Sequence, residues 1–272
     1  MGKERTRHKR RLGDLPVSVL RFTKSELAGV PAPHRSFYLL LGQFNNELTI
    51  LHGLLFQAVN GVRGPDVAQE PALGMVLFLA RSMGGRLYEL RGAINNGKNS
   101  QLLAQLWDAQ PMAAVDKSAR IDGEEGRHRL NRYFGQKKAF LSGIRNKLAY
   151  HLDQTQMDAG FERLPDEVSL ADFHTGIRGT TFYGAADTVA LYASADLANL
   201  QEGFATAQQI MAETHDVFVG ATEFINAYMF AFNFTYFGVE RIRGMPVEIL
   251  HDVPALAKSR LHFFFRAKMP EV

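Results

Sequence analysis

Residues 144–151 contain three side chains that could act together on a phosphate. Five residues separate Arg145 from His151, and Asn146 follows the arginine directly. Histidine gives and takes protons near neutral pH, and the permanent charge of arginine stabilises negative charge on phosphate oxygens. Asparagine could orient the histidine or the substrate. Because RNA supplies its own nucleophile, the 2′-hydroxyl, these groups could cleave a phosphodiester without a metal.

The spacing of Arg145 and His151 limits how they can meet. On a straight helix they lie about 120° apart around the axis and about 9 Å apart along it. They are therefore not same-face neighbours, as an i,i+4 pair would be. Three arrangements satisfy the spacing: the arginine wraps around the helix, the helix loosens near its end, or a second chain supplies part of the site. Alternatively, these residues are only a solvated last turn, where cations suit the helix dipole.

The segment FLSGIRNKLAYHLD, residues 140–153 and here called the motif segment, resembles the signature helix of the HEPN superfamily. In that signature an arginine, usually followed by a polar residue, precedes a histidine. The resemblance covers roughly residues 34–240 and implies an all-α bundle. It also implies a metal-independent endoribonuclease of a toxin–antitoxin, abortive-infection or CRISPR-linked system. If the roles of the family's motif are carried over to this chain, His151 is the acid/base, Arg145 is the phosphate and transition-state ligand, and Asn146 is the positioning residue.

The resemblance also implies partners. HEPN proteins typically form homodimers in which two motifs face each other, and this arrangement would place a phosphate between two chains. RNA would be the substrate, and an antitoxin or operon partner is a further candidate. Some HEPN toxins carry a tyrosine two residues after the histidine, which a nucleotidyltransferase modifies, but residue 153 is Asp. The alternative function is a non-catalytic helical interaction or regulatory module.

The composition is that of an ordinary globular protein. Of 272 residues, 46% are hydrophobic and 22% charged, and there is no cysteine. The lack of cysteine excludes a disulfide scaffold and Cys-ligated metal sites. It also fits a cytoplasmic location, which we expect. The histidines show no metal-ligand spacing and there is no P-loop, so no cofactor and no metal are expected.

The net charge of +3 is unevenly distributed. Residues 1–11 contain six Lys or Arg and one Glu, so the rest of the chain is slightly acidic. This basic arm could contact nucleic-acid phosphates or be a solvated terminus. No apolar stretch follows it, so it is not a secretory signal.

Hydrophobic periodicity predicts an all-α bundle of four to five main helices. Apolar residues recur at helical spacing over residues 34–60, 68–94 and 124–152. Ser100 could cap a short helix, a last long helix is expected from near Ser194 to about Phe237, and a short one within 246–268. Residues 217–237 are as long as a bilayer span, but Glu223 interrupts them, so a buried helix and no membrane contact are expected.

The helical pattern is interrupted over residues 160–193. Glycines punctuate this stretch, and the runs 180–183 and 188–192 are β-prone, which predicts a small β-hairpin insertion. The expected organisation is thus a basic arm and lead-in over residues 1–33, followed by one HEPN-like helical domain over residues 34–272 that carries the hairpin at about 160–193.

Other polar residues of the first two helices could line a cleft that faces the motif segment, or could form structural ion pairs. They are Asn45, Asn46, Glu47, Arg86, Glu89 and Arg91. His52 stands alone among apolar residues of the first helix, which indicates a core residue. Phe224, Tyr228, Phe232 and Tyr236 recur every four residues, which favours the core or a dimer surface over a base-stacking platform.

Overall fold

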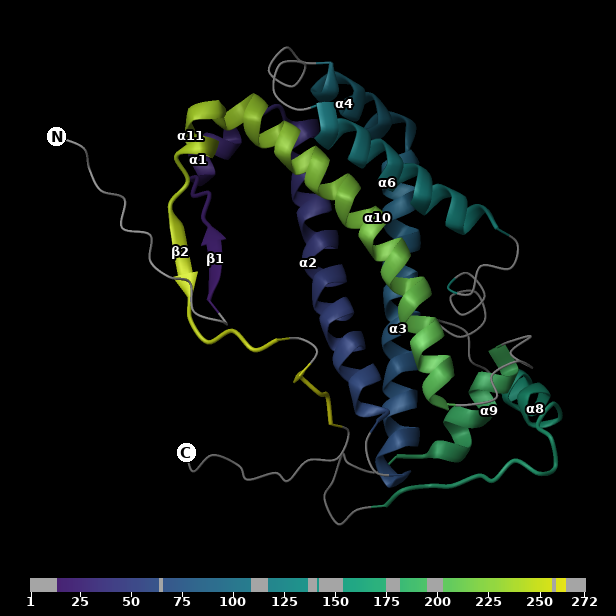
Figure 1. The fold of residues 1–272 in the computed structure, drawn as a ribbon. Coiled ribbons are helices and arrows are strands. Elements are labelled where there is room, and N and C mark those ends of the chain that lie inside the picture. Colours follow the sequence, from purple (N-terminus) through teal and green to yellow (C-terminus); the bar gives the residue numbers. More distant parts are fainter. Residues whose placement is uncertain are drawn as a thin grey trace.

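The computed structural model describes residues 14–63, 66–108, 117–136, 141, 154–174, 182–194, 203–255 and 258–262. Over these residues the chain is predominantly helical and has one small antiparallel sheet (Figure 1). The predicted fold class, a helical bundle with a small two-stranded element, is confirmed. No helix in the described parts of the chain is long and apolar enough to cross a membrane.

Among the described residues, four long helices form the bundle. They are α2 (Ala32–Gly61), α3 (Asp66–Asn95), α6 (Lys117–Gly135) and α10 (Gly203–Phe237). The helices α2 and α3 lie side by side, α10 crosses both, and α6 lies against α10 (Figure 1). The bounds of α2 and α3 confirm the helices that periodicity predicted at 34–60 and 68–94.

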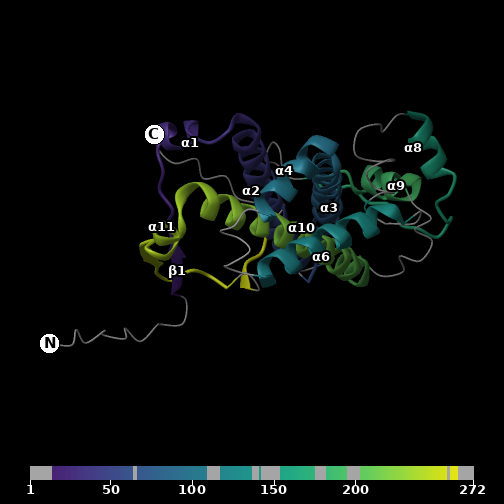
Figure 2. The same cartoon turned by 90° about the horizontal axis from the view of Figure 1, so that it is seen from above.

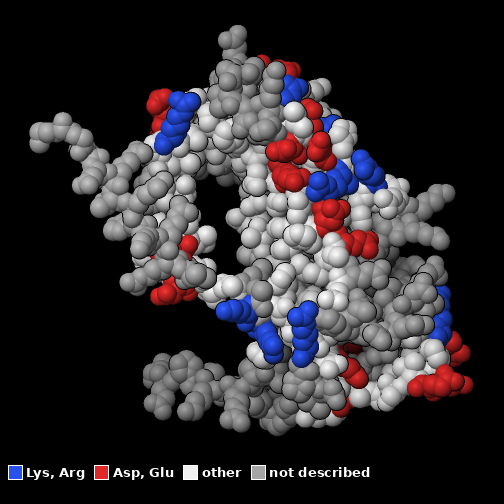
Figure 3. Space-filling model, in the orientation of Figure 1, with Lys and Arg blue, Asp and Glu red and all other residues white. Residues whose placement is uncertain are grey.

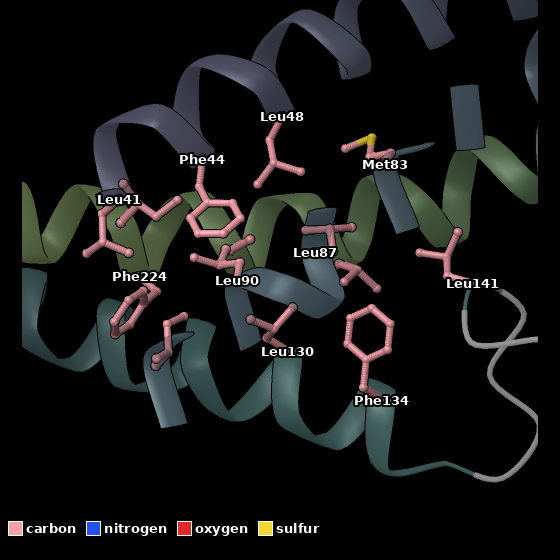
Figure 4. Packing of buried hydrophobic residues seen from close by; sticks show 14 of the residues in the cluster. Leu41, Phe44, Leu48, Met83, Leu87, Leu90, Leu130, Phe134, Leu141 and Phe224 are labelled. Atoms are coloured by element: carbon pink, nitrogen blue, oxygen red, sulfur yellow. The ribbon is translucent and has the colours of Figure 1, made fainter. Parts of the chain in front are cut away.

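The core lies where these four helices meet, and each contributes large apolar side chains. Figure 4 shows them converging from α2, α3, α6 and α10 onto one cluster. Burial of a side chain of this size contributes about 1.5–3 kcal/mol relative to exposure. The cluster includes Leu41, Phe44, Leu48, Met83, Leu87, Leu90, Leu130, Phe134 and Phe224.

The aromatic stripe of α10 belongs to this core. Phe224, Tyr228 and Phe232 are inaccessible to solvent. The ring of Phe37, from α2, meets that of Tyr228 edge-on, with the centroids 4.9 Å apart. The stripe is therefore not a base-stacking platform, because its first three rings are covered by protein.

Helix α4 (Gly97–Trp107) packs on α10, α3 and α2 and buries Leu103, Leu106 and Trp107. Its N-cap is Asn96, whose side-chain oxygen accepts a hydrogen bond from the backbone N–H of Lys98. The expected cap, Ser100, instead lies within the helix, where its hydroxyl donates to the carbonyl of Ile94 at 3.2 Å. The helix thus begins one turn earlier than the sequence suggested.

The helix that was expected to run to residue 152 ends earlier. Helix α6 begins at Lys117 and ends at Gly135. The N–H of Gln136 bonds to the carbonyl of Tyr133, the three-residue spacing of a tightened last turn. Leu141 is again helical. Glycine lacks the helix propensity to carry the chain through this point, so the expectation of one continuous helix was wrong.

The region expected to hold a β-hairpin is organised differently. Phe173 and Phe182 exchange two backbone hydrogen bonds of 2.7 and 2.8 Å and form a single antiparallel bridge. The β-prone run 188–192 is helical, within α9 (Gly184–Ser194), and α8 (Gln154–Phe161) packs beside it. Burial of Val189 on the packed face of α9 outweighs the β propensity of the run.

The start of the last long helix also differs from expectation. Ser194 ends α9, and α10 begins at Gly203 but ends at Phe237 as predicted. Seen from above, α8 and α9 lie at one end of the molecule and α11 (Val239–Arg243) at the other (Figure 2).

The two-stranded sheet joins segments far apart in the sequence. Strand β1 (Leu15–Ser18) pairs antiparallel with β2 (Val247–Leu250), with Leu15 opposite Leu250. Residues 15–18 of the predicted arm and lead-in thus form a strand. A short helix was expected within residues 246–268; residues 247–250 of this range form β2, and residues 256–257 and 263–268 lie outside the described residues.

Helix α1 (Lys24–Ala28) completes this end of the molecule. Thr23 and Glu26 form a reciprocal capping box, which satisfies two donors at the helix start. Arg241 of α11 pairs with Glu26 at 2.5 Å. The hydrogen bond from Arg241 is the main reason that the pKa of Glu26 falls to about 2, and the N–H of Thr23 adds to it.

Candidate functional site

The predicted catalytic residues Arg145, Asn146 and His151 lie outside the described residues. The described residues that flank them are Leu141 and Gln154, the first residue of α8. The setting of the motif segment is therefore given by Leu141 and by the helices that hold it.

Leu141 is fixed against α3. Its side chain has no solvent exposure, and it packs on Gly84 so closely that a Cβ at Gly84 would lie 3.2 Å from the Cβ of Leu141. Because Gly84 has no side chain, the side chain of Leu141 can pack directly against α3. Arg145 follows only four residues later in the chain.

A tyrosine of α6 holds Leu141 from the other side. The backbone N–H of Leu141 donates to the hydroxyl of Tyr133 at 2.9 Å, and that hydroxyl donates to the carboxylate of Glu213 on α10. Burial, followed by the hydrogen bond to Glu213, raises the pKa of Tyr133. The hydroxyl therefore keeps its proton, and Leu141, α6 and α10 are joined through one oxygen atom.

A polar pocket lies further along the same side of α3. Residues 84, 88, 91 and 95 are spaced by four, three and four, so they lie along one helix face. The rise of an α-helix places residue 91 about 10 Å from residue 84 along the axis. The pocket, here called the arginine pocket, has a volume of about 460 Å³ and is lined by Tyr88, Arg91, Gly92, Asn95 and Asn131.

Two asparagine amides organise the arginine pocket. Asn131 of α6 accepts from the Nε of Arg91 at 3.2 Å and from the Nδ2 of Asn95 at 2.6 Å. The Nδ2 of Asn131 donates back to the Oδ1 of Asn95 at 3.2 Å. The Nδ2 of Asn95 also donates to the carbonyl of Arg91 at 2.9 Å. This network holds the guanidinium in one orientation at the pocket wall.

The other polar residues predicted to face the motif segment do not gather with Arg91. Arg86 pairs with Glu47 at 2.8 Å and with Glu89 at 2.6 Å, so these three form the structural ion pairs considered as the alternative. Asn45 is half-buried and Asn46 exposed. Glu47 and Arg86 instead line a second pocket, between α2 and α3, of about 490 Å³.

Charges of both signs also meet between α6 and α10. Arg129 lies 3.6 Å from Glu223 and 3.9 Å from Asp216. Figure 3 shows basic and acidic side chains beside one another over these two helices. Surface pairs of this kind contribute little to stability.

His52 lies in a histidine pair and not in the core. Its Nε2 is 3.0 Å from the Nδ1 of His215 on α10, and its ring stacks on that of Phe218 at 4.1 Å. Burial, and then the charge of His215, lowers the pKa of His52 to about 4. No local pattern indicates this pair, because its members are 163 positions apart. Within the described ranges, no three His, Asp or Glu residues are grouped so as to hold a metal ion.

Sequence reasoning named Arg91 but missed Asn95 and Asn131 as its partners. A signal existed, since each asparagine directly follows a buried apolar residue, Ile94 or Leu130. Each amide therefore lies at the border of a buried face. Which helix faces which could not be read from this pattern.

The fold defines an all-α protein built on four long, closely packed helices. Neither a protein-family model, nor a curated protein, nor a solved structure matches the chain.

Proposed function

We propose that the protein is a HEPN-like, metal-independent endoribonuclease, with His151 as acid/base, Arg145 as phosphate ligand and Asn146 as positioning residue. The anchoring of Leu141 carries the proposal. Leu141, within the motif segment, is fully buried and is held by Tyr133, which fixes one point of the chain four residues before Arg145. A fixed start is what a site needs if its residues are to keep their geometry during catalysis.

The proposed reaction is an internal displacement at phosphorus. The 2′-oxygen of the RNA attacks, its proton leaves, the bond from phosphorus to the 5′-oxygen breaks, and that oxygen takes up a proton. The products are a 2′,3′-cyclic phosphate and a 5′-hydroxyl. His151 moves the protons, which contributes about 10²–10⁴-fold to the rate, and Arg145 stabilises the charge on the phosphate oxygens.

The proposal includes a homodimer. On one straight helix Arg145 and His151 point in directions about 120° apart, and two facing motifs would bring one residue of each kind to the same phosphate. RNA is then the partner of the dimer, in a cytoplasmic defence or stress response, with an antitoxin or operon protein as a candidate regulator.

A second candidate, a non-catalytic interaction module, is favoured by the pocket between α2 and α3. Two of the residues that line it are exposed apolar side chains, Ile50 at 62% and Phe78 at 57%. Exposed apolar groups of this size are typical of surfaces that bind a protein partner.

The test is cleavage of single-stranded RNA in the presence of EDTA by the wild type, His151→Ala and Arg145→Ala. His128→Ala is the matched control, because His128 is an exposed histidine of α6. We expect each motif variant to lose about 10²–10⁴-fold in rate, the control to be unchanged, and the cleaved ends to carry cyclic phosphates. Activity that survives both motif substitutions refutes the site. No cleavage of any RNA supports the interaction module.

A further inference from the structure

We propose that the arginine pocket binds a phosphate group of an RNA strand. The identity of the ligand rests on the proposed function, but the site itself rests on Arg91, Asn95 and Asn131. None of these three belongs to the motif segment. They would position the strand and would not take part in the chemistry.

The hydrogen bonds of Arg91 leave most of its donors for a ligand. A guanidinium has five N–H groups, and here the Nε–H donates to Asn131. In the described part of the chain, no hydrogen bond and no ion pair uses the four N–H groups on its terminal nitrogens. By contrast, Arg86 and Arg241 each pair with a carboxylate. Arg91 thus has a planar fork with the geometry of a phosphate ligand.

The amides beside Arg91 select for an anion. The Oδ1 of Asn131 already accepts two hydrogen bonds, and the Oδ1 of Asn95 accepts from Asn131. One N–H of the Asn131 amide still has no partner among the described residues. These three side chains therefore present mainly donors and one positive charge to the pocket. A phosphate oxygen satisfies such a set, whereas a cation does not.

The size and position of the arginine pocket fit a segment of RNA. Its volume of about 460 Å³ lies within the range of small-ligand sites, so it can hold a phosphate with part of its sugar. Leu141, four residues before Arg145 in the chain, lies on the same side of α3 and about two helical turns from Arg91.

Gly92 allows the pocket to be blocked without touching its polar residues. Gly92 is exposed and helical, and a Cβ built on it would meet nothing within 4 Å. Leucine at this position would extend toward the pocket, and its helix propensity is higher than that of glycine. Gly53 of α2 has the same open surroundings but lies outside the residues that line this pocket, so Gly53→Leu is the matched control.

The experiment measures binding of a fluorescein-labelled single-stranded RNA by anisotropy over a series of salt concentrations. The His151→Ala chain is used, so that the RNA stays intact. We add Arg91→Gln, Gly92→Leu, Gly53→Leu or Arg243→Gln, the last an exposed arginine of α11. We expect Arg91→Gln to weaken binding roughly tenfold and to reduce the slope of log K against log salt by about 0.7. Gly92→Leu weakens binding to a similar extent, and both controls stay within about twofold of the parent.

The outcomes separate this site from the proposed activity. If the protein cleaves no RNA but binds it in a way that depends on Arg91 and is blocked by Gly92→Leu, the proposed pocket is supported and the proposed nuclease is refuted. Cleavage by the wild type, with binding that neither substitution changes, keeps the nuclease and overturns the pocket. A parent chain that binds no RNA also overturns it. Thermal melts of each variant show whether the fold is retained, and Arg91→Lys, which keeps the charge but not the fork, should give intermediate binding.

Discussion

The backbone N–H of Leu141 donates to the side-chain hydroxyl of Tyr133 at 2.9 Å, so a side chain of α6 fixes the backbone that leads into the motif segment. The two residues are eight positions apart. Because the same hydroxyl donates to Glu213, a single oxygen connects the motif segment with two helices of the bundle.

Replacing Tyr133 by phenylalanine tests this connection. The N–H of the buried Leu141 would lose its partner, and a buried donor without a partner costs about 1–3 kcal/mol. We expect Tyr133→Phe to lower the free energy of unfolding by that amount in urea titrations, and to lower RNA cleavage because the motif is held less firmly. Tyr183→Phe, at an exposed tyrosine, is the control and should change neither. Equal stability of the two variants would contradict the role assigned to the hydroxyl.

The histidine pair predicts a loss of stability in mild acid. The pKa of His52 is about 4 in the folded protein, below its ordinary value of 6.5, so the unfolded chain takes up the proton first as the pH falls. Stability is therefore fully present above pH 6.5 and is lost between 6.5 and 4. Because His52 is only half-buried, we expect solvent screening to reduce the loss to about 1–2 kcal/mol.

This loss can be assigned to His52 by comparing urea unfolding at pH 7 and pH 5. The His52→Phe variant keeps a ring that can stack on Phe218, but this ring does not titrate. The free energy of unfolding of the variant should therefore change less between pH 7 and pH 5. His128→Phe, at an exposed position of α6, should keep the wild-type dependence. If His52→Phe loses as much stability in acid as the wild type, another group is responsible.

The crossing of α6 and α10 depends on glycine. A Cβ at Gly126 would collide with the backbone carbonyl of Gly220 and lie 3.1 Å from the backbone nitrogen of Phe224. Backbone atoms cannot move aside cheaply, so Gly126→Ala should destabilise the protein by about 1–3 kcal/mol. Gly53→Ala, where the added methyl meets nothing, should stabilise it by up to about 1 kcal/mol through helix propensity. Thermal melts of the two variants should therefore shift in opposite directions.

If the catalytic site is shared between the two chains of a dimer, two inactive variants should complement each other. If each phosphate lies between Arg145 of one chain and His151 of its partner, a mixed dimer of Arg145→Ala and His151→Ala chains has one intact site. Random mixing of the two after subunit exchange should then restore roughly a quarter of the wild-type activity. Light scattering checks the premise, since a strictly monomeric protein has no such site. Activity that stays absent in a confirmed mixed dimer would show that each site needs both residues from both chains.

The features that the sequence predicted well are those that depend on local pattern. Long apolar periodicity located α2 and α3 to within two residues at each end, because a buried face must recur every three to four residues along a helix. The break after Gly135 was missed, since a glycine within a helical pattern is compatible with either continuation or an end. The run 188–192 was misread because its burial in α9 depends on neighbours that the local sequence does not show.

The features that could not be predicted depend on which helices become neighbours. The Gly126–Gly220 contact, the His52–His215 pair and the amide network of the arginine pocket each join residues of two helices. Arg91 was named from its position beside apolar residues. That no carboxylate of the described residues pairs with it, in contrast to Arg86, emerged only once the packing was known. The motif residues themselves remain a prediction from the sequence.

The pairing of β1 with β2 has a consequence for synthesis. Leu15 of β1 pairs with Leu250 of β2, so the partner of β1 leaves the ribosome more than 200 residues later than β1 itself. Until then β1 has an unpaired edge, which is a template for wrong associations. A chain that stalls before residue 247 keeps that edge permanently. The sheet can therefore form only after translation has passed residue 250.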